Sequence, residues 1–133
     1  MATTSGESGV RTIDVIAGAA VSKGRYLARD STGRYQHCAA GLVPDGVATE
    51  AASGAGISIA MAIMNGAMIP MESGAAMATD GVLVKSDSTG RAIAYTVGAG
   101  ISAAGRLAGT AGAAGEYPVV QIFNSGSPAS TTG

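Results

Sequence analysis

Apolar and polar residues alternate in short stretches along this chain, which is the pattern of β-strands with one buried face. Ile13 and Val15 alternate with Thr12 and Asp14 in the first such stretch, where we expect the ordered domain to begin. The alanine-rich stretch 97–117 is interrupted by glycine at six positions, and each glycine costs about 1 kcal/mol in a helix interior. The pattern therefore predicts an all-β protein with loops or short turns between the strands.

Two hairpins are predicted at the five residues DSTGR, which occur at 30–34 and again at 87–91. In each copy the Asp can accept hydrogen bonds from backbone N–H groups two residues on, and the Gly supplies the positive φ of a bulged type I turn. We therefore assign Asp30, Gly33, Asp87 and Gly90 to structural turns between antiparallel strands. A loop that contacts a partner is the alternative interpretation.

The similarity between the two halves extends beyond these turns. Residues 19–34 and 76–91 are identical at seven of sixteen positions, and the segment from Gly46 aligns with the segment from Gly105 when three extra residues are allowed in the second copy. Two copies are too few for a solenoid, which needs about three repeats. We predict a single β domain over 11–123, built from related units at approximately 19–64 and 76–123.

A third hairpin is predicted within 57–71, ISIAMAIMNGAMIPM, because Asn65-Gly66 is the strongest two-residue turn signal. Pro70 assigns the returning strand to a sheet edge. Methionines concentrate in and just after this segment: Met61, Met64, Met68, Met71 and Met77. Flexible side chains of this kind fill irregular cores, and an adaptable contact surface is the alternative.

Composition indicates a shallow core and two flexible ends. Of the 133 residues 27 are alanine, and there is one Phe and no Trp, so little apolar area is available to offset the entropy of folding. We infer that association with other chains contributes much of the stability. The ends, 1–10 and 124–133, are rich in Ser, Thr and Gly, and we expect both to be flexible arms unless a partner binds them.

The charges and the reactive side chains exclude several classes of function. The net charge is -1 and the basic residues are scattered from Arg11 to Arg106, so nucleic acid is not an expected partner. The sequence has no long apolar run, so no membrane segment is expected. Cys38 and His37 are the only Cys and His, too few for a disulfide or a zinc site.

Motifs for catalysis or cofactor binding are incomplete. Gly98, Gly100 and Ala103 match G-x-G-x-x-A, but the helix and second strand of a dinucleotide site have no counterpart. Arg106 stands where a phosphate-binding loop needs Lys, and no G-x-S-x-G motif accompanies His37 for a catalytic triad. We assign no catalytic, metal-ligating or cofactor-binding residue, and expect neither enzymatic activity nor a cofactor.

The order and spacing of turn glycines and small residues in "GAAVSKGRYLARDSTGRYQHCAAG" and "PDGVATEAASGAGISIAM" resemble the capsid decoration, or cement, proteins of tailed bacteriophages. The resemblance covers roughly 13–123. It is carried by Gly24, Leu27, Asp30, Gly33, Gly46, Val47, Ala48, Ala52, Gly54, Gly56 and Ile57 in the first half, and by Gly81, Val84, Asp87 and Gly90 in the second.

This resemblance implies a small β-barrel or β-sandwich-like domain with extended arms. It also implies a virion protein on the outer surface of an icosahedral head, made in the host cytoplasm. Such proteins clamp neighbouring subunits of the major capsid protein after the shell expands, as dimers or trimers. A small β-rich binding module for a glycan or a host surface is the alternative, and exposed aromatic side chains would be its sign.

The N-terminal arm and the methionine-rich segment are the expected contact surfaces with the capsid or with other subunits. An extended arm can add to an exposed sheet edge and gain main-chain hydrogen bonds without a deep pocket. The candidate contact residues are Val10, Arg11, Ile13, Val15, Met64, Met68 and Met71.

Overall fold

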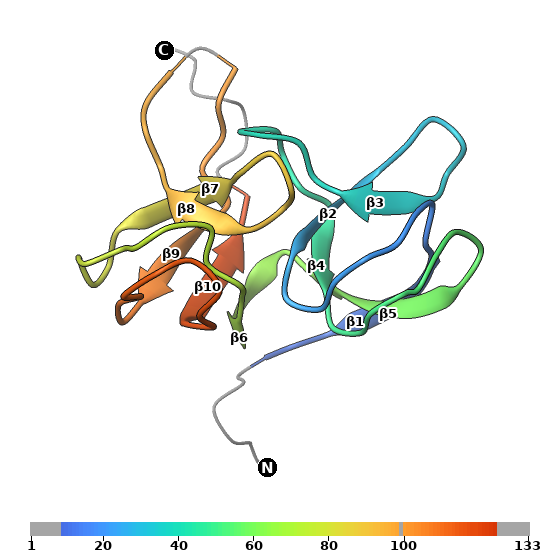
Figure 1. Cartoon of the computed structure of the whole chain (residues 1–133), viewed down its shortest axis with the longest axis horizontal. Coiled ribbons are helices and arrows are strands. Elements are labelled where there is room, and N and C mark those ends of the chain that lie inside the picture. Colours follow the sequence, from blue (N-terminus) through green and yellow to red (C-terminus); the bar gives the residue numbers. More distant parts are fainter. Residues whose placement is uncertain (1–8, 99, 125–133) are drawn as a thin grey trace.

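Two five-stranded antiparallel sheets, one from each half of the chain, make up the protein (Figure 1). The computed structural model describes residues 9–98 and 100–124, and these contain no helix. The strands are β1 (Thr12–Ile16), β2 (Tyr26–Arg29), β3 (Tyr35–His37), β4 (Gly46–Ala48), β5 (Ser58–Ile63), β6 (Asn65–Pro70), β7 (Leu83–Ser86), β8 (Ala92–Ala94), β9 (Gly105–Ala108) and β10 (Val119–Phe123). The predicted all-β fold with two related units is confirmed.

The two sheets have the same topology. Their strand orders are β1-β5-β4-β2-β3 and β6-β10-β9-β7-β8, so each strand of the first sheet has its counterpart five strands later. The units are longer than the sequence repeat indicated, because the first strand of each pairs with the last. Leu27 and Val84 are equivalent, as are Gly46 and Gly105. The first pair is 57 residues apart and the second 59, so the insertion is two residues rather than three.

The predicted hairpin within 57–71 is wrong. β5 and β6 are separated only by Met64, yet they belong to different sheets: β5 pairs with β1 and β4, whereas β6 pairs with β10. Asn65 and Gly66 therefore begin β6 instead of forming a turn, although the Asn65 side chain still accepts a local hydrogen bond from the Ala67 N–H at 3.2 Å. Strand pairing within each repeat outweighs the local turn preference. β6 does lie at a sheet edge, as Pro70 indicated.

The core joins the two halves into one structure. A smaller apolar cluster, which includes Leu27 and Ile59, belongs to the first half, whereas a larger one combines residues of both halves. Tyr26 is the largest side chain in the larger cluster; it is fully buried, and its hydroxyl donates a hydrogen bond to the carbonyl of Ala104 at 2.8 Å. We call the contact between the two halves the seam.

Three of the five methionines in the described part of the chain belong to the core. Met61, Met71 and Met77 are buried, whereas Met64 and Met68 are half-buried. Filling of an irregular, alanine-rich interior by flexible side chains explains this distribution. Met71 is therefore not accessible to a partner, contrary to its assignment as a contact residue.

Candidate interaction surfaces

The two DSTGR turns have the same internal hydrogen bonds. In the first, Asp30 Oδ1 accepts from the N–H groups of Thr32 and Arg34 at 2.8 and 3.0 Å. In the second, Asp87 accepts from the two equivalent N–H groups at 2.8 and 2.9 Å. The hydrogen bond from the Thr32 hydroxyl is the main cause that lowers the pKa of Asp30. Each turn closes a hairpin, β2–β3 in the first half and β7–β8 in the second.

The surroundings of the two turns differ, however. Gly33 (φ +83°) lies near the molecular surface, where a Cβ atom would meet only the side chain of Arg29. Gly90 (φ +85°) is buried against the first half: its carbonyl accepts a hydrogen bond from the Tyr26 N–H at 2.7 Å, and a Cβ atom there would lie 2.6 Å from the Tyr26 carbonyl oxygen. The second turn is thus part of the seam, whereas the first makes no such contact with the other half in the part of the chain that the structure describes.

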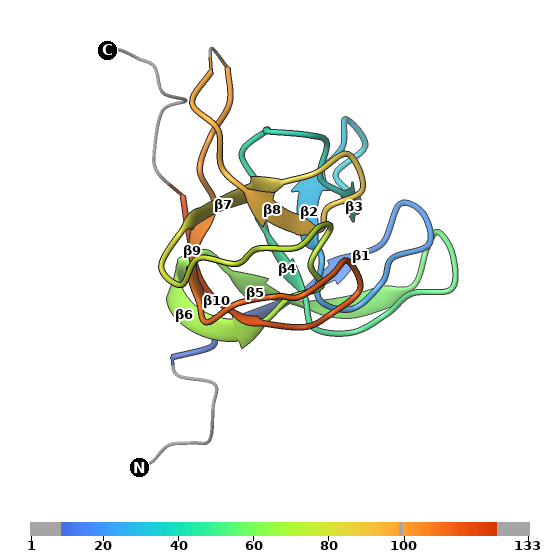
Figure 2. The same cartoon turned by 60° about the vertical axis from the view of Figure 1, so that its left-hand side comes forward.

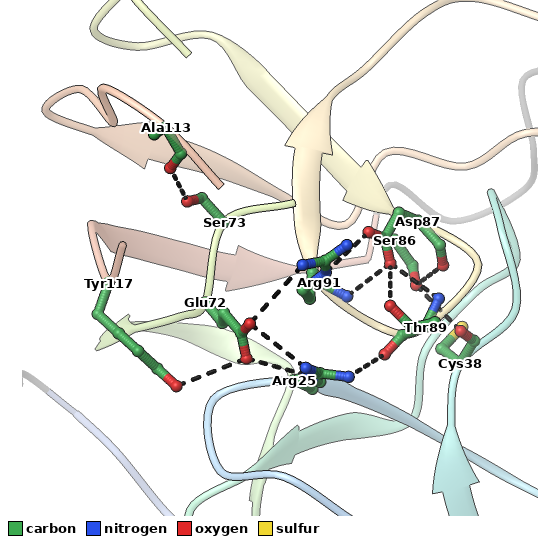
Figure 3. A network of polar contacts seen from close by, with 10 residues as sticks. All are labelled: Arg25, Cys38, Glu72, Ser73, Ser86, Asp87, Thr89, Arg91, Ala113 and Tyr117. Atoms are coloured by element: carbon green, nitrogen blue, oxygen red, sulfur yellow. Dashed lines mark hydrogen bonds and ion pairs between the residues drawn. The ribbon is translucent and has the colours of Figure 1, made fainter. Parts of the chain in front are cut away.

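A polar network reinforces the seam beside this turn (Figure 3). Glu72, whose side chain is 12% exposed, accepts a hydrogen bond from Arg25 Nε at 3.0 Å and lies 3.8 Å from Arg91 Nη1. Arg91 also pairs with Asp87 through Nε at 3.2 Å. Arg25 comes from the first half and the other three residues from the second. The network therefore links the two halves through charge-assisted hydrogen bonds in a partly desolvated setting.

His37 and Cys38, the residues with potential chemistry, serve structural roles. His37 Nε2 accepts a hydrogen bond from the Ser22 N–H at 3.0 Å, which requires an unprotonated nitrogen. Burial raises the pKa of the Cys38 thiol to about 11, so it is protonated at neutral pH. Among the described residues, no three His, Cys, Asp or Glu side chains gather as metal ligands, and no helix is long and apolar enough to cross a membrane.

The protonation of His37 makes stability depend on pH. Burial, assisted by the charge of Arg25, lowers the pKa of His37 in the folded protein, whereas in the unfolded chain it is about 6.5. As the pH falls below that value, the unfolded chain takes up a proton first, so the free energy of unfolding decreases until the pH passes the folded pKa. We expect urea midpoints to fall between pH 7 and pH 5, and to fall less in His37→Gln. An identical pH dependence in both proteins would contradict this assignment.

The predicted contact residues divide into accessible and buried members. Arg11 and Ile13 are exposed, the latter to 48%. Val15 is only 6% exposed, whereas Ile13, two residues earlier and on the same face of β1, is left uncovered. Val15 is therefore not accessible on the surface of the protein, contrary to its assignment as a contact residue. Val10, Met64 and Met68 are half-buried, and residues 1–8 and 125–133, most of the predicted arms, lie outside the described residues.

β1 combines exposed apolar side chains with a free edge. Among residues 9–98 and 100–124, β1 pairs only with β5, and no strand pairs with its opposite row of backbone groups. Ile13 and Ile16 are both exposed on this strand. Edge strands of this kind are templates for pairing with another chain.

A groove of about 600 Å³ opens between the two halves. It is lined by Val10, Thr12, Lys23, Gly24, Ala48, Thr49, Ile69, Pro70 and Tyr117. Tyr117 is 54% exposed, and its ring lies beside Gly24, where a Cβ atom would be 2.9 Å from Cε2 of the ring. This is the exposed aromatic side chain that a glycan-binding module would require.

Two loops add an apolar surface that the sequence did not indicate. Leu42, Val43 and Val97 are exposed, on the loops that follow β3 and β8 (Figure 2). The loops are in contact, because the Ser102 N–H donates to the Gly41 carbonyl at 2.9 Å. Exposure of isolated apolar residues in loops leaves no periodic signal, and only the absence of charge from 95–104 hints at this surface.

Comparison with known proteins shows that the fold is similar to that of one phage protein of known structure. No protein-family model matches the sequence, and no curated protein matches it. Among solved structures, the protein is similar to the crystal structure of the N base of head fiber gp8.5 in bacteriophage phi29, with a TM-score of 0.69 and 18% sequence identity over 92% of this chain and 99% of that chain. A phage head protein thus has the β fold that the resemblance to capsid decoration proteins implied.

Proposed function

We propose that this protein is a structural component of a phage head. The likeness to the phi29 head fiber base supports this proposal, because it extends over 92% of the chain and 99% of the other. The sequence resemblance to capsid decoration proteins points to the same kind of virion protein. A structural role also agrees with the use of the polar and titratable side chains, which stabilise turns and the seam.

The finer proposal is a cement role on the outer surface of the shell. In this role the protein binds the major capsid protein after expansion, as an oligomer of two or three copies, and stabilises contacts between neighbouring subunits without catalysis or a cofactor. The free edge of β1, with Arg11 and Ile13 exposed, is suited to main-chain pairing with a capsid strand. Contacts repeated in several copies strengthen one another through avidity.

Binding to a glycan or a host surface is the second candidate function. Tyr117 favours it, because this side chain is both exposed and held in place beside the groove. An aromatic ring with a fixed orientation provides contact area at a low entropic cost. Head binding and glycan binding are distinguished by whether the purified protein binds empty shells.

Electron microscopy of shells mixed with the purified protein tests the proposal. The samples are expanded empty heads and unexpanded precursors of the phage that encodes the chain, each with the full chain and with a variant lacking 2–10. We expect ordered density at symmetry positions on expanded heads only, with lower occupancy for the deletion variant. Absence of density on both kinds of shell would overturn head binding, and equal density on both would overturn the requirement for expansion. Unchanged occupancy of the deletion variant would exclude the N-terminal arm as a contact with the shell.

A further inference from the structure

Of the two DSTGR turns, 87–91 is docked on the other half of the chain and 30–34 is not. Turn 87–91 packs on a surface of the first half formed by Arg25, Tyr26 and His37, all of which approach Gly90. Turn 30–34 has the same sequence and the same internal hydrogen bonds. Among the described residues, however, only the Arg29 side chain lies within 4 Å of a Cβ atom at Gly33.

The first-half surface that receives turn 87–91 also has a counterpart in the second half, on which no turn is docked. The register of the strands makes Val82, Leu83 and Ala94 the counterparts of Arg25, Tyr26 and His37. Ala94 is exposed, and Val82 and Leu83 are half-buried, whereas Tyr26 is fully buried. The neighbouring glycines show the same difference, because Gly24 faces Tyr117 and its counterpart Gly81 faces open space.

We propose that turn 30–34 of one copy docks on the Val82–Leu83–Ala94 surface of a second copy, head to tail. The contact inside the chain is the template for the contact between chains: each half offers the same turn and an equivalent surface, but the seam uses only one of each. A head-to-tail contact leaves a free turn at one end and a free surface at the other, so it propagates into a ring if the rotation between copies closes and into a filament if it does not.

Side chains around the unused contact suit association between chains. In the seam, Arg25 of the first half pairs with Glu72 of the second. Ala17 and Ser73 occupy equivalent bridges, so the residues directly before them, Ile16 and Glu72, are also equivalent. Because Val82 is the counterpart of Arg25, the equivalent pair between two copies is Val82 with Ile16. Ile16 is 40% exposed. The ion pair of the seam is thereby replaced by two apolar side chains that would become buried together, which is favourable in proportion to the area removed from water.

Arg29 limits the strength of this contact. It occupies the position equivalent to Ser86, directly before the turn, and its guanidinium lies 3.4 Å from the position of a Cβ atom at Gly33. A docking partner must displace this side chain, whereas the small Ser86 leaves turn 87–91 open to the seam. Arg29→Ser, which copies the docked turn, should therefore strengthen association.

This inference deepens the self-association included in the proposed function, but it is tested in solution without shells, so that its failure and the failure of head binding are distinguishable. The full chain is measured by sedimentation over a wide range of concentrations. We expect reversible association, a dissociation constant about tenfold lower for Arg29→Ser, and one at least about tenfold higher for Ala94→Glu and for Ile16→Asp. Ala113→Glu, in a loop that carries none of these residues, is the charge control and should associate like the wild type.

Two results would overturn the proposal. One is that both the wild type and Arg29→Ser remain monomeric at every concentration. The other is association that is equally strong in Ala94→Glu, Ile16→Asp and the control. Thermal unfolding of each variant establishes that it is folded, and turn 30–34 and Ala94 lie on the surface, where substitutions leave the core intact.

Discussion

Gly90→Ala is expected to lower the free energy of unfolding by roughly 3–5 kcal/mol, whereas Gly33→Ala costs only about 1–2 kcal/mol. Both glycines have a positive φ, of +85° and +83°, so an alanine is strained to the same extent at either position. Only at Gly90 does the new methyl group also collide with backbone, since it would lie 2.6 Å from the Tyr26 carbonyl oxygen. Relief of that collision requires the two halves to move apart.

Urea unfolding of the two variants measures this difference directly, because each substitution is the matched control of the other. The same sequence context and the same turn geometry surround both positions. Equal losses of stability would show that the seam adapts to an added methyl group, and would contradict close packing of turn 87–91 on the first half.

Glu72→Gln is expected to cost about 2–3 kcal/mol, between the values for exposed and fully buried ion pairs. Its carboxylate contacts two guanidinium groups, Arg25 and Arg91, and is largely shielded from water. The amide keeps the shape of the side chain but leaves both cations without their shared counterion. Because Arg25 and Glu72 belong to different halves, the lost interaction is one that fastens the seam.

Asp14→Asn provides the control for this change. It removes the same unit of negative charge from an exposed position on β1, so its effect on stability should be within about 0.5 kcal/mol. Chemical unfolding at low and high salt completes the comparison. A cost for Glu72→Gln that is no larger than that of the control, or that disappears in high salt, would mean that the network acts as an ordinary surface ion pair.

Much of the fold could be predicted from the sequence because its turns carry their own chemistry. Asp30 and Asp87 accept hydrogen bonds from N–H groups of their own turns, and these local interactions can be predicted from a five-residue sequence. The failure at Asn65-Gly66 has the opposite origin. There the local preference for a hairpin competes with pairing to β10, more than 50 residues away in the sequence, and the long-range pairing prevails.

The interaction surfaces were less predictable than the strands. Alternation identified Ile13 and Val15 as members of one face of a strand but did not show that the core covers Val15 and leaves Ile13 exposed. The two copies of DSTGR are identical, so the motif itself does not reveal which copy is docked. The only sequence sign lies just before each turn, where Arg29 in one copy and Ser86 in the other differ in size and charge.

The one-residue connection at Met64 bears on how such a protein can arise. A single unit of five strands would leave Tyr26 or its counterpart uncovered, and would have to find a second unit by diffusion. Fusion of two units through Met64 makes that encounter intramolecular, so that the pairing no longer depends on protein concentration. Once fused, the copies are free to diverge, and one of them can acquire the large aromatic side chain that the other then has to accommodate.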